Sequence, residues 1–276
     1  MKNIKVILRG IGQVMLQNNA WTGLFFLLGI SYNSWIMGLG AILGTFVGTI
    51  SAKILKYSKD DIKNGLYGFN GTLVGIAIYY FFHFNFYTLI AIIIGSILST
   101  VLMHEIKEKI PAYTSPFVLS TWIILFIIGL LKLAPSIIHY NLIFNSFNYI
   151  ISIFTGVGQV MFQGSVITGF LFLIGIIINS RKSAIYAIYG SILGTLFALL
   201  ISLPLSSINI GLFGYNAVLC GIALEGKGSK NFIFTTIGIL LSVVLNLWMG
   251  DIGIITLTAP FVISTWIILI IKKYFK

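Results

Sequence analysis

Charged side chains are scarce in this sequence. Only 8% of its 276 residues are Asp, Glu, Lys or Arg, whereas 58% are hydrophobic. An ordinary soluble domain carries about 25% charged residues, so this composition excludes a soluble globular protein. Apolar runs close to the ~20 residues that cross a bilayer follow one another with little interruption. The sequence therefore predicts an all-α polytopic membrane protein.

Cysteine and histidine are almost absent as well. A single cysteine, Cys220, excludes an internal disulfide framework and a multi-cysteine metal site, and we expect it to be buried as a small hydrophobic residue. The three histidines are His83, His104 and His139, and none has a repeated partner. Because no nucleophile–base pair and no metal-ligand spacing is present, we expect no enzyme activity, no cofactor and no metal site.

Acidic residues number six, and none lies in the middle of an apolar segment. Carriers coupled to protons or ions usually keep an ionisable residue within the membrane, in spite of its cost. Its absence favours a neutral solute that moves passively. A sodium ion held by carbonyl and hydroxyl oxygens alone stays open as an alternative.

Three blocks of sequence occur twice, in the same order. Two copies at this spacing predict homologous halves, residues 1–146 and 147–276, that together form one membrane domain, and the default substrate path of such a protein is the interface between the repeats. The block pairs are Gln13–Gln17 with Gln159–Gln163, Gly65–Ala77 with Gly211–Ala223, and Thr114–Trp122 with Thr258–Trp266.

Each half contains five apolar segments, and a pair of glutamines interrupts the first segment of each. Several side-chain amides on one lipid-facing helix would be costly, and irregular backbone is tolerated at membrane depth only inside protein or beside water. The motif thus indicates a re-entrant or broken helix in both halves. We expect residues 1–30 to remain in the protein rather than form a cleaved signal, since the same segment recurs at 156–176. The ten segments are 6–31, 35–52, 64–82, 86–103 and 114–131 in the first half, and 151–178, 184–203, 209–225, 231–248 and 254–271 in the second.

Basic residues predict the orientation of these segments. If the N-terminus is cytoplasmic and each segment crosses once, sixteen of the seventeen Lys and Arg are cytoplasmic, and Lys132 is the exception. The loop after the second segment is basic only in the first half, and the loop after the third is basic only in the second half. Equivalent loops then lie on opposite sides, which predicts two inverted five-helix repeats with ten transmembrane helices. Both termini are expected in the cytoplasm, and the connector 132–146 on the outer surface.

Neutral polar and apolar side chains at matched positions are candidates to line a solute path. Gln13 and Gln159 offer amides, and Thr114 and Thr258 offer hydroxyls two residues before a proline. Four apolar or aromatic residues accompany them at helical spacing, where ordinary packing is the alternative explanation. They are Phe69, Leu73, Tyr215 and Leu219.

The repeated motifs resemble those of the urea transporter family over essentially the whole chain. The residues that carry the resemblance are Gln-Val-Met-Leu-Gln-Asn-Asn at 13–19, Gly-Phe-Asn-Gly-Thr-Leu-Val-Gly at 68–75, Thr-Ser-Pro-Phe at 114–117, and their partners in the second half. The resemblance implies a homotrimer in which each subunit holds a central pore lined by re-entrant half-helices. It also implies passive, channel-like transport of urea across the cytoplasmic membrane.

The same resemblance implies roles for individual residues. The selectivity filter would comprise Gln13, Val14, Leu16, Gln159, Val160 and Phe162. The walls of a flat slot would comprise Phe69, Leu73, Tyr215 and Leu219, and the centre of the pore Thr114 and Thr258. The sequence departs from the family at Leu16 and Tyr215, where phenylalanine or another apolar residue is frequent.

Other functions remain open on the sequence alone. A channel for another small neutral solute, such as ammonia, a short amide or an alkylurea, would need similar lining residues. An ion-coupled carrier and a non-transporting membrane scaffold belong to different classes. Membrane lipid is an expected partner of every one of them, and nucleic acid of none, because the basic residues form no continuous face.

Overall fold

The computed structural model describes residues 2–134, 137 and 146–274, and within these residues every regular element is a helix. The chain divides into two compact units, Met1–His139 and Tyr140–Lys276. Most of the predicted connector, with His139, lies outside the described residues, as does the extreme C-terminus. Each unit is described by itself below.

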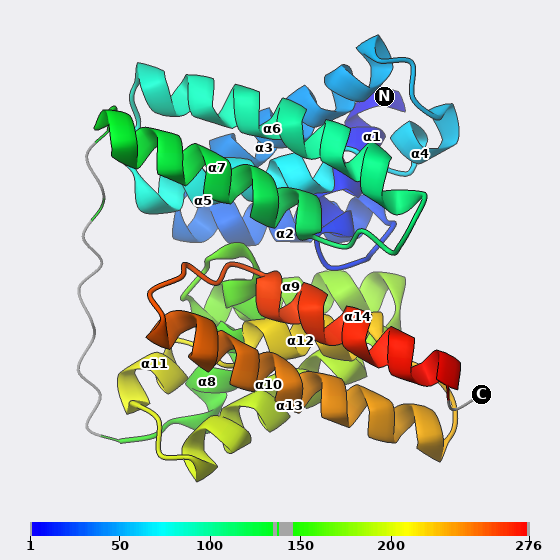
Figure 1. The fold of residues 1–276 in the computed structure, drawn as a ribbon, viewed down its shortest axis with the longest axis vertical. Helices are drawn as coiled ribbons and strands as arrows, with labels where there is room; N and C mark the ends of the chain where they lie inside the picture. Colours follow the sequence, from blue (N-terminus) through cyan, green and yellow to red (C-terminus); the bar gives the residue numbers. More distant parts are fainter. Residues whose placement is uncertain (1, 135–136, 138–145, 275–276) are drawn as a thin grey trace. The chain divides into compact units, whose positions relative to one another are not determined.

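The described part of the first unit contains seven helices, shown from blue to green in Figure 1. Helix α3 packs against α5 and α6, and α7 packs against the same two helices, while α1 and α2 pack together beside α3. The helices are α1 (Lys2–Gln13), α2 (Ala20–Asn33), α3 (Trp35–Ile54), α4 (Lys59–Lys63), α5 (Phe69–Phe81), α6 (Phe86–Lys107) and α7 (Ser115–Leu131).

The second unit repeats this order of helices. Helix α10 packs against α12 and α13, α14 packs against the same two, and α8 pairs with α9. The elements are α8 (Tyr149–Gly158), the short 3₁₀ helix η1 (Gln159–Met161), α9 (Val166–Asn179), α10 (Arg181–Leu200), α11 (Leu205–Asn209), α12 (Tyr215–Ala223), α13 (Ser229–Asp251) and α14 (Ala259–Tyr274).

Among the described residues, four helices are long and apolar enough to cross a membrane: α3, α6, α10 and α13. The pair formed by Tyr149–Met161 and Val166–Asn179 passes the same test as one span that is bent by 72°. Several shorter apolar helices accompany them. The central helix α5 has 13 residues, or about 20 Å of rise, and α12 has nine, or about 14 Å. Neither helix alone covers the ~30 Å hydrocarbon layer.

Small residues let the central helix of the first unit approach its neighbour directly. A Cβ atom added to Gly44 of α3 would lie 1.9 Å from the carbonyl oxygen of Gly71 in α5. The two backbones are therefore in contact. Such contacts are common between membrane helices, because the hydrophobic effect does not drive helices together in lipid and their association depends on close packing at small residues. This packing encloses α5, whose residues from Phe69 to Tyr79 are all buried.

Cys220 is buried in α12, as the sequence predicted. Its thiol lies 3.9 Å from the carbonyl oxygen of Phe261 and 3.8 Å from the hydroxyl of Thr265, so it packs between α12 and α14. A position of this kind is typical of a structural cysteine rather than a reactive one.

Candidate functional site

The first glutamine motif ends helix α1 and turns the chain into α2. Leu16 adopts the left-handed conformation with φ 61°, and the N–H of Gln17 donates to the carbonyl of Gly12 at 3.1 Å. This bond, with the one from Leu16 N–H to the carbonyl of Gln13 at 2.9 Å, closes the end of the helix. Asn19 then begins α2, because its side-chain oxygen accepts the N–H of Trp21 at 2.8 Å.

The second motif repeats this geometry. Phe162 also has φ 61°, and the N–H of Gln163 donates to the carbonyl of Gly158 at 3.1 Å. Ser165 begins the following helix in the role of Asn19. Both first segments are thus interrupted, as the sequence predicted. In each, a hydrogen-bonded helix end is followed by the capped start of a new helix.

The second glutamine of each motif is a structural residue. Gln17 and Gln163 are buried, and the side-chain amide of each donates to a carbonyl two residues earlier, that of Met15 at 2.8 Å and that of Met161 at 2.6 Å. A buried carbonyl without a partner costs about 1–3 kcal/mol, so these amides stabilise the break. The sequence analysis predicted no role for Gln17 or Gln163.

The residues implied as the filter differ in their exposure. Val14 and Val160 are buried, whereas Leu16 and Phe162 retain partial exposure. The first glutamines, Gln13 and Gln159, are also partly exposed. Gln13 donates from Nε2 to the carbonyl of Asn64 at 3.1 Å, which ties the end of α1 to the turn before α5. The other polar atom of this amide, Oε1, can accept a hydrogen bond.

The beginnings of α5 and α7 meet in the first unit. Asn70, in the first turn of α5, accepts the N–H of Phe117 on its side-chain oxygen at 3.1 Å. Thr114, the residue before α7, makes no side-chain cap bond of its own. An asparagine of one helix therefore satisfies an N-terminal N–H of another, which such helix ends otherwise leave open. The contact brings Phe69 and Thr114 to neighbouring helix starts.

The second unit carries the same contact and adds a second one. Asn216 accepts the N–H of Phe261 at 3.2 Å, as Asn70 does in the first unit. In addition, the hydroxyl of Tyr215 lies 2.7 Å from the carbonyl oxygen of Leu257, the residue directly before Thr258. Tyr215 and Thr258, both predicted from the sequence, are thus brought together.

The phenol of Tyr215 is fully occupied by protein groups. Its oxygen also lies 3.0 Å from the hydroxyl of Thr256 and 3.2 Å from Oδ1 of Asn246. Its single hydrogen serves either Leu257 or Asn246, and the hydroxyl of Thr256 can donate to it. Phe69, the equivalent residue of the first unit, has no hydroxyl, so this network is specific to the second unit.

The remaining wall and centre residues are inaccessible within this chain. Leu73 and Leu219 have no exposed surface, Thr114 has none, and Thr258 has 2%. Each leucine lies one turn beyond Phe69 or Tyr215 on its helix, so the predicted helical spacing is present. In each unit the helix that starts with Phe69 or Tyr215 contacts both the glutamine motif and the helix that follows Thr114 or Thr258.

Charged groups of the first unit gather around Asp61 and Lys107, on α4 and at the end of α6. The ammonium of Lys107 lies 2.6 Å from a carboxylate oxygen of Asp61, and 5.7 Å from the centre of the Tyr67 ring. The Tyr67 hydroxyl lies 3.2 Å from Nδ1 of His104. His104 in turn stacks on Tyr57, with ring centres 3.8 Å apart.

In the part of the chain that the structure describes, no three His, Cys, Asp or Glu side chains are grouped as a metal ion would need.

These features define a class of protein. The chain is an all-helical membrane protein with several apolar helices, and each of its two units pairs a broken first segment with a short, buried central helix.

Comparison with known proteins identifies the family. The model of the urea transporter family matches residues 4–273, nearly the whole chain, and the chain belongs to this family. It is 30% identical to urea transporter 1 of Mus musculus over 250 residues, which are 80% of this chain and 62% of that protein. It is 28% identical to urea transporter 1 of Capra hircus over 303 aligned positions, covering 96% of this chain and 76% of that protein. The chain thus spans less than two thirds of the mouse relative.

Proposed function

We propose that this protein carries urea passively across the cytoplasmic membrane, down its gradient, through a narrow slot in each subunit. The observation that carries the proposal is the family match over residues 4–273. The repeated helix breaks at Gln13–Gln17 and Gln159–Gln163 support it, since both halves of the chain supply the same filter motif in the same backbone conformation. The relatives that the chain resembles are themselves named urea transporters.

The architecture that we propose is two inverted five-helix repeats, with ten crossings, re-entrant half-helices and a central pore. The repeats are 1–146, which includes the outer connector 132–146, and 147–276. The distribution of Lys and Arg among the loops supports the inversion and favours a cytoplasmic position for both termini. The short central helices α5 and α12 agree with half-helices that stop within the membrane. By resemblance to the family, the assembly is a homotrimer in which each subunit has its own pore.

The chemistry of urea explains the polar side of such a slot. Urea is flat and neutral, and its N–H groups lose water when they enter a narrow pore. Each unmet polar group costs about 1–3 kcal/mol, so acceptor oxygens must replace that water. We assign this role to the oxygens of Gln13 and Gln159 and to the hydroxyls of Thr114 and Thr258. The C-terminal ends of α1 and η1 add partial negative charge, which strengthens nearby acceptors.

The apolar side of the slot would contact the faces of the urea molecule. Phe69, Leu73, Tyr215 and Leu219 supply aromatic and aliphatic walls, with Val14, Val160, Leu16 and Phe162 at the filter. A narrow wall of this kind rejects hydrated ions, since an ion loses far more solvation than urea does. The hydroxyl of Tyr215 is held by Leu257, Thr256 and Asn246, so we assign the ring, and not the hydroxyl, to the slot.

The deciding experiment is stopped-flow light scattering on proteoliposomes that contain the full chain. We expect fast urea permeation without any ion gradient and without change when an ionophore is added. The control is the double variant Thr114→Val and Thr258→Val, with its folding checked by size-exclusion chromatography. Permeation equal to that of empty liposomes, with folded protein in the membrane, would overturn the proposal.

The same assay separates the alternatives. Permeation of ammonia, short amides or alkylureas without urea would assign another neutral solute. Uptake that collapses with an ionophore would assign a coupled carrier. No permeation of any solute, together with wild-type stability of bulky variants at Thr114 and Thr258, would indicate a scaffold.

A further inference from the structure

The first unit carries an apolar groove along α3, lined by residues that the proposed slot does not include. Its volume is about 460 Å³, and it is formed by the faces of α1, α2 and α3. The walls are aliphatic or aromatic over most of their length, and they include Ile7, Leu27, Ile42 and Phe46. Phe46 and Ile42 are 51% and 41% exposed, so their side chains are not covered by this chain.

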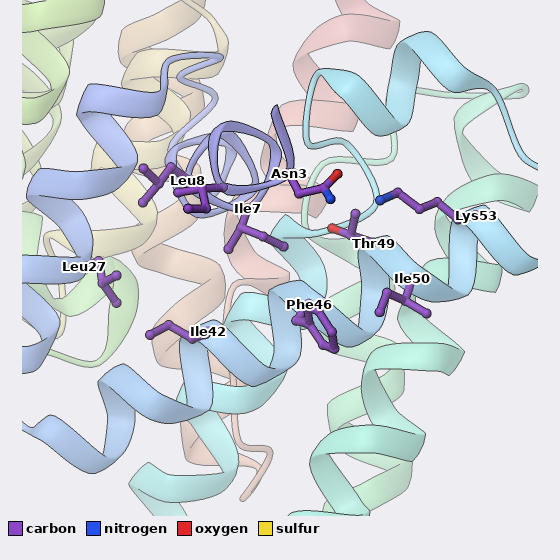
Figure 2. Close-up of a pocket in the computed structure, with 10 residues that line it drawn as sticks. Asn3, Ile7, Leu8, Leu27, Ile42, Phe46, Thr49, Ile50 and Lys53 are labelled. Atoms are coloured by element: carbon purple, nitrogen blue, oxygen red, sulfur yellow. The ribbon is translucent and has the colours of Figure 1, made fainter. Parts of the chain in front are cut away.

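One end of the groove is polar (Figure 2). Asn3 of α1 and Thr49 and Lys53 of α3 lie together there, with the amide, the hydroxyl and the ammonium close to one another, while Leu27 and Ile42 lie toward the opposite end. The side chain of Lys53 is exposed at the C-terminal end of its helix. A cation above an apolar channel matches an anionic headgroup above an acyl chain.

Thr49 provides an independent observation. Its side chain is 3% exposed, and its hydroxyl has no hydrogen-bond partner among the described residues. A buried hydroxyl without a partner costs about 1–3 kcal/mol. Most threonines in helices avoid this cost by donating to a carbonyl of the preceding turn, as Thr45 does with Ala41 at 2.6 Å. The hydroxyl of Thr49 is covered by neighbouring protein atoms, so a ligand oxygen reaches it only when a side chain at the polar end moves aside.

The groove continues along the helix. A second hollow of about 300 Å³ is lined by Ile36, Leu39 and Tyr79, and it shares Ile42 and Phe46 with the first. From Lys53 to Ile36, α3 rises about 26 Å at 1.5 Å per residue. This length approaches the thickness of a bilayer's hydrocarbon layer, so an acyl chain that starts at Lys53 stays in contact with apolar wall throughout its own leaflet.

We propose that this groove binds one anionic phospholipid. One acyl chain lies along α3 between α1 and α2, the phosphate pairs with Lys53 and accepts from the amide of Asn3, and Thr49 donates to an ester or phosphate oxygen. The site is on the leaflet that Lys53 faces, which is the cytoplasmic one in the proposed orientation. The inference needs only a membrane-embedded chain, and it holds whether or not urea is the solute.

The first test is native mass spectrometry of the full chain, released from nanodiscs that contain equal amounts of phosphatidylglycerol and phosphatidylcholine. We expect one phosphatidylglycerol to be retained per chain in preference to phosphatidylcholine. Lys53→Gln should weaken the retention about fivefold, the equivalent of about 1 kcal/mol for one basic residue at an anionic surface. Lys59→Gln, an exposed lysine of α4 outside the groove, is the matched control and should retain the lipid. Equal loss with both variants, or no preference for phosphatidylglycerol, would overturn the proposal.

Thr49→Val separates a ligand from a structural role. In detergent without lipid, the variant should be at least as stable as the wild type, because an unsatisfied hydroxyl is replaced by a methyl group. The rise in melting temperature on addition of phosphatidylglycerol should be smaller for the variant. A variant that loses stability in detergent and gains as much from the lipid as the wild type would contradict a lipid-binding hydroxyl.

A second copy of the chain is the competing occupant. Under oxidising conditions, or with a short bifunctional thiol reagent, Ile42→Cys should give no covalent dimer if lipid covers the groove. The single native cysteine is buried and serves as the background. Efficient formation of a dimer through position 42 would assign the groove to an interface between copies and overturn the lipid site.

Discussion

The side-chain oxygen of Asn70 accepts the backbone N–H of Phe117 at 3.1 Å, and both residues are buried. The N–H groups of the first turn of a helix have no partner within that helix. Here the partner comes from a different helix, so α5 and the beginning of α7 are fixed to each other. The same contact occurs between Asn216 and Phe261 at 3.2 Å. The side-chain oxygens of Asn70 and Asn216 thus hold the helix starts around them in place.

Asn70→Ala should therefore destabilise the protein and impair permeation together. The substitution removes the side-chain acceptor of the buried N–H of Phe117, which costs about 1–3 kcal/mol. We expect a lower melting temperature in detergent and slower urea permeation, because Thr114 is no longer held beside the start of α5. Asn18→Ala, at an exposed position, should leave the melting temperature unchanged. Wild-type stability of Asn70→Ala would show that the contact does not fix the two helices.

The threonines before α7 and α14 should control the rate of permeation. Thr114→Val with Thr258→Val removes two acceptor hydroxyls from the proposed slot. A loss of about 1–3 kcal/mol per unmet group predicts urea permeation at least about tenfold slower, measured by stopped flow. Thr121→Val in α7 is the control, since its hydroxyl is buried without a partner among the described residues. Wild-type flux in the double variant would remove both threonines from the slot.

Substitution by glycine at two residues with left-handed backbone should distinguish the cost of backbone strain from a role of the side chain in permeation. Leu16 and Lys56 both have positive φ, at 61° and 58°. A non-glycine residue pays roughly 1–2 kcal/mol in this conformation, so Lys56→Gly, which is exposed, should raise the melting temperature. Leu16→Gly relieves the same strain but removes a wall of the proposed filter.

Urea permeation measured beside that of thiourea is the readout for this pair. Leu16→Gly should change the ratio of the two rates, and Lys56→Gly should not. An unchanged ratio in Leu16→Gly would indicate that the side chain at this position only ends the helix.

Tyr215→Phe should cost stability and spare permeation. The variant restores the residue type that the first unit has at Phe69, but it leaves the carbonyl of Leu257 with only the amide of Asn216 at 3.4 Å. Losing one such hydrogen bond costs about 0.5–1.5 kcal/mol. Chemical or thermal unfolding in detergent measures this loss, and stopped flow measures the permeation. A large fall in permeation at unchanged stability would show that the hydroxyl, and not the ring, contacts the solute.

Asn246→Met provides the companion measurement for that network. If Tyr215 and Asn246 act together, their double variant should lose less stability than the sum of the two single variants. Strict additivity would mean that the hydrogen of Tyr215 serves Leu257 alone.

Many residues of the candidate site could be predicted from the repeated blocks of the sequence. Gln13 and Gln159, Leu16 and Phe162, and Thr114 and Thr258 were all found because the sequence places them twice in equivalent contexts. The geometry agrees with that pairing, since Leu16 and Phe162 share one unusual backbone angle. The asparagines of α5 and α12 were visible to the same reasoning, but sequence spacing alone does not distinguish a residue that faces a solute from one that caps a helix 47 residues away.

The class of this protein follows from its amino-acid sequence: a helical membrane protein whose two halves repeat the same segments, with the first segment of each half interrupted. Composition and repetition are enough to predict this class, because whether a segment is stable in water or in lipid depends on the residues of that segment alone. Three features could be seen only in the folded chain: α12 is a helix of nine residues, Tyr215 is anchored through its hydroxyl, and the hydroxyl of Thr49 is buried without a partner among the described residues. These outcomes depend on which backbone groups meet across different helices, and a hydrogen bond between distant residues leaves no periodic trace in the chain.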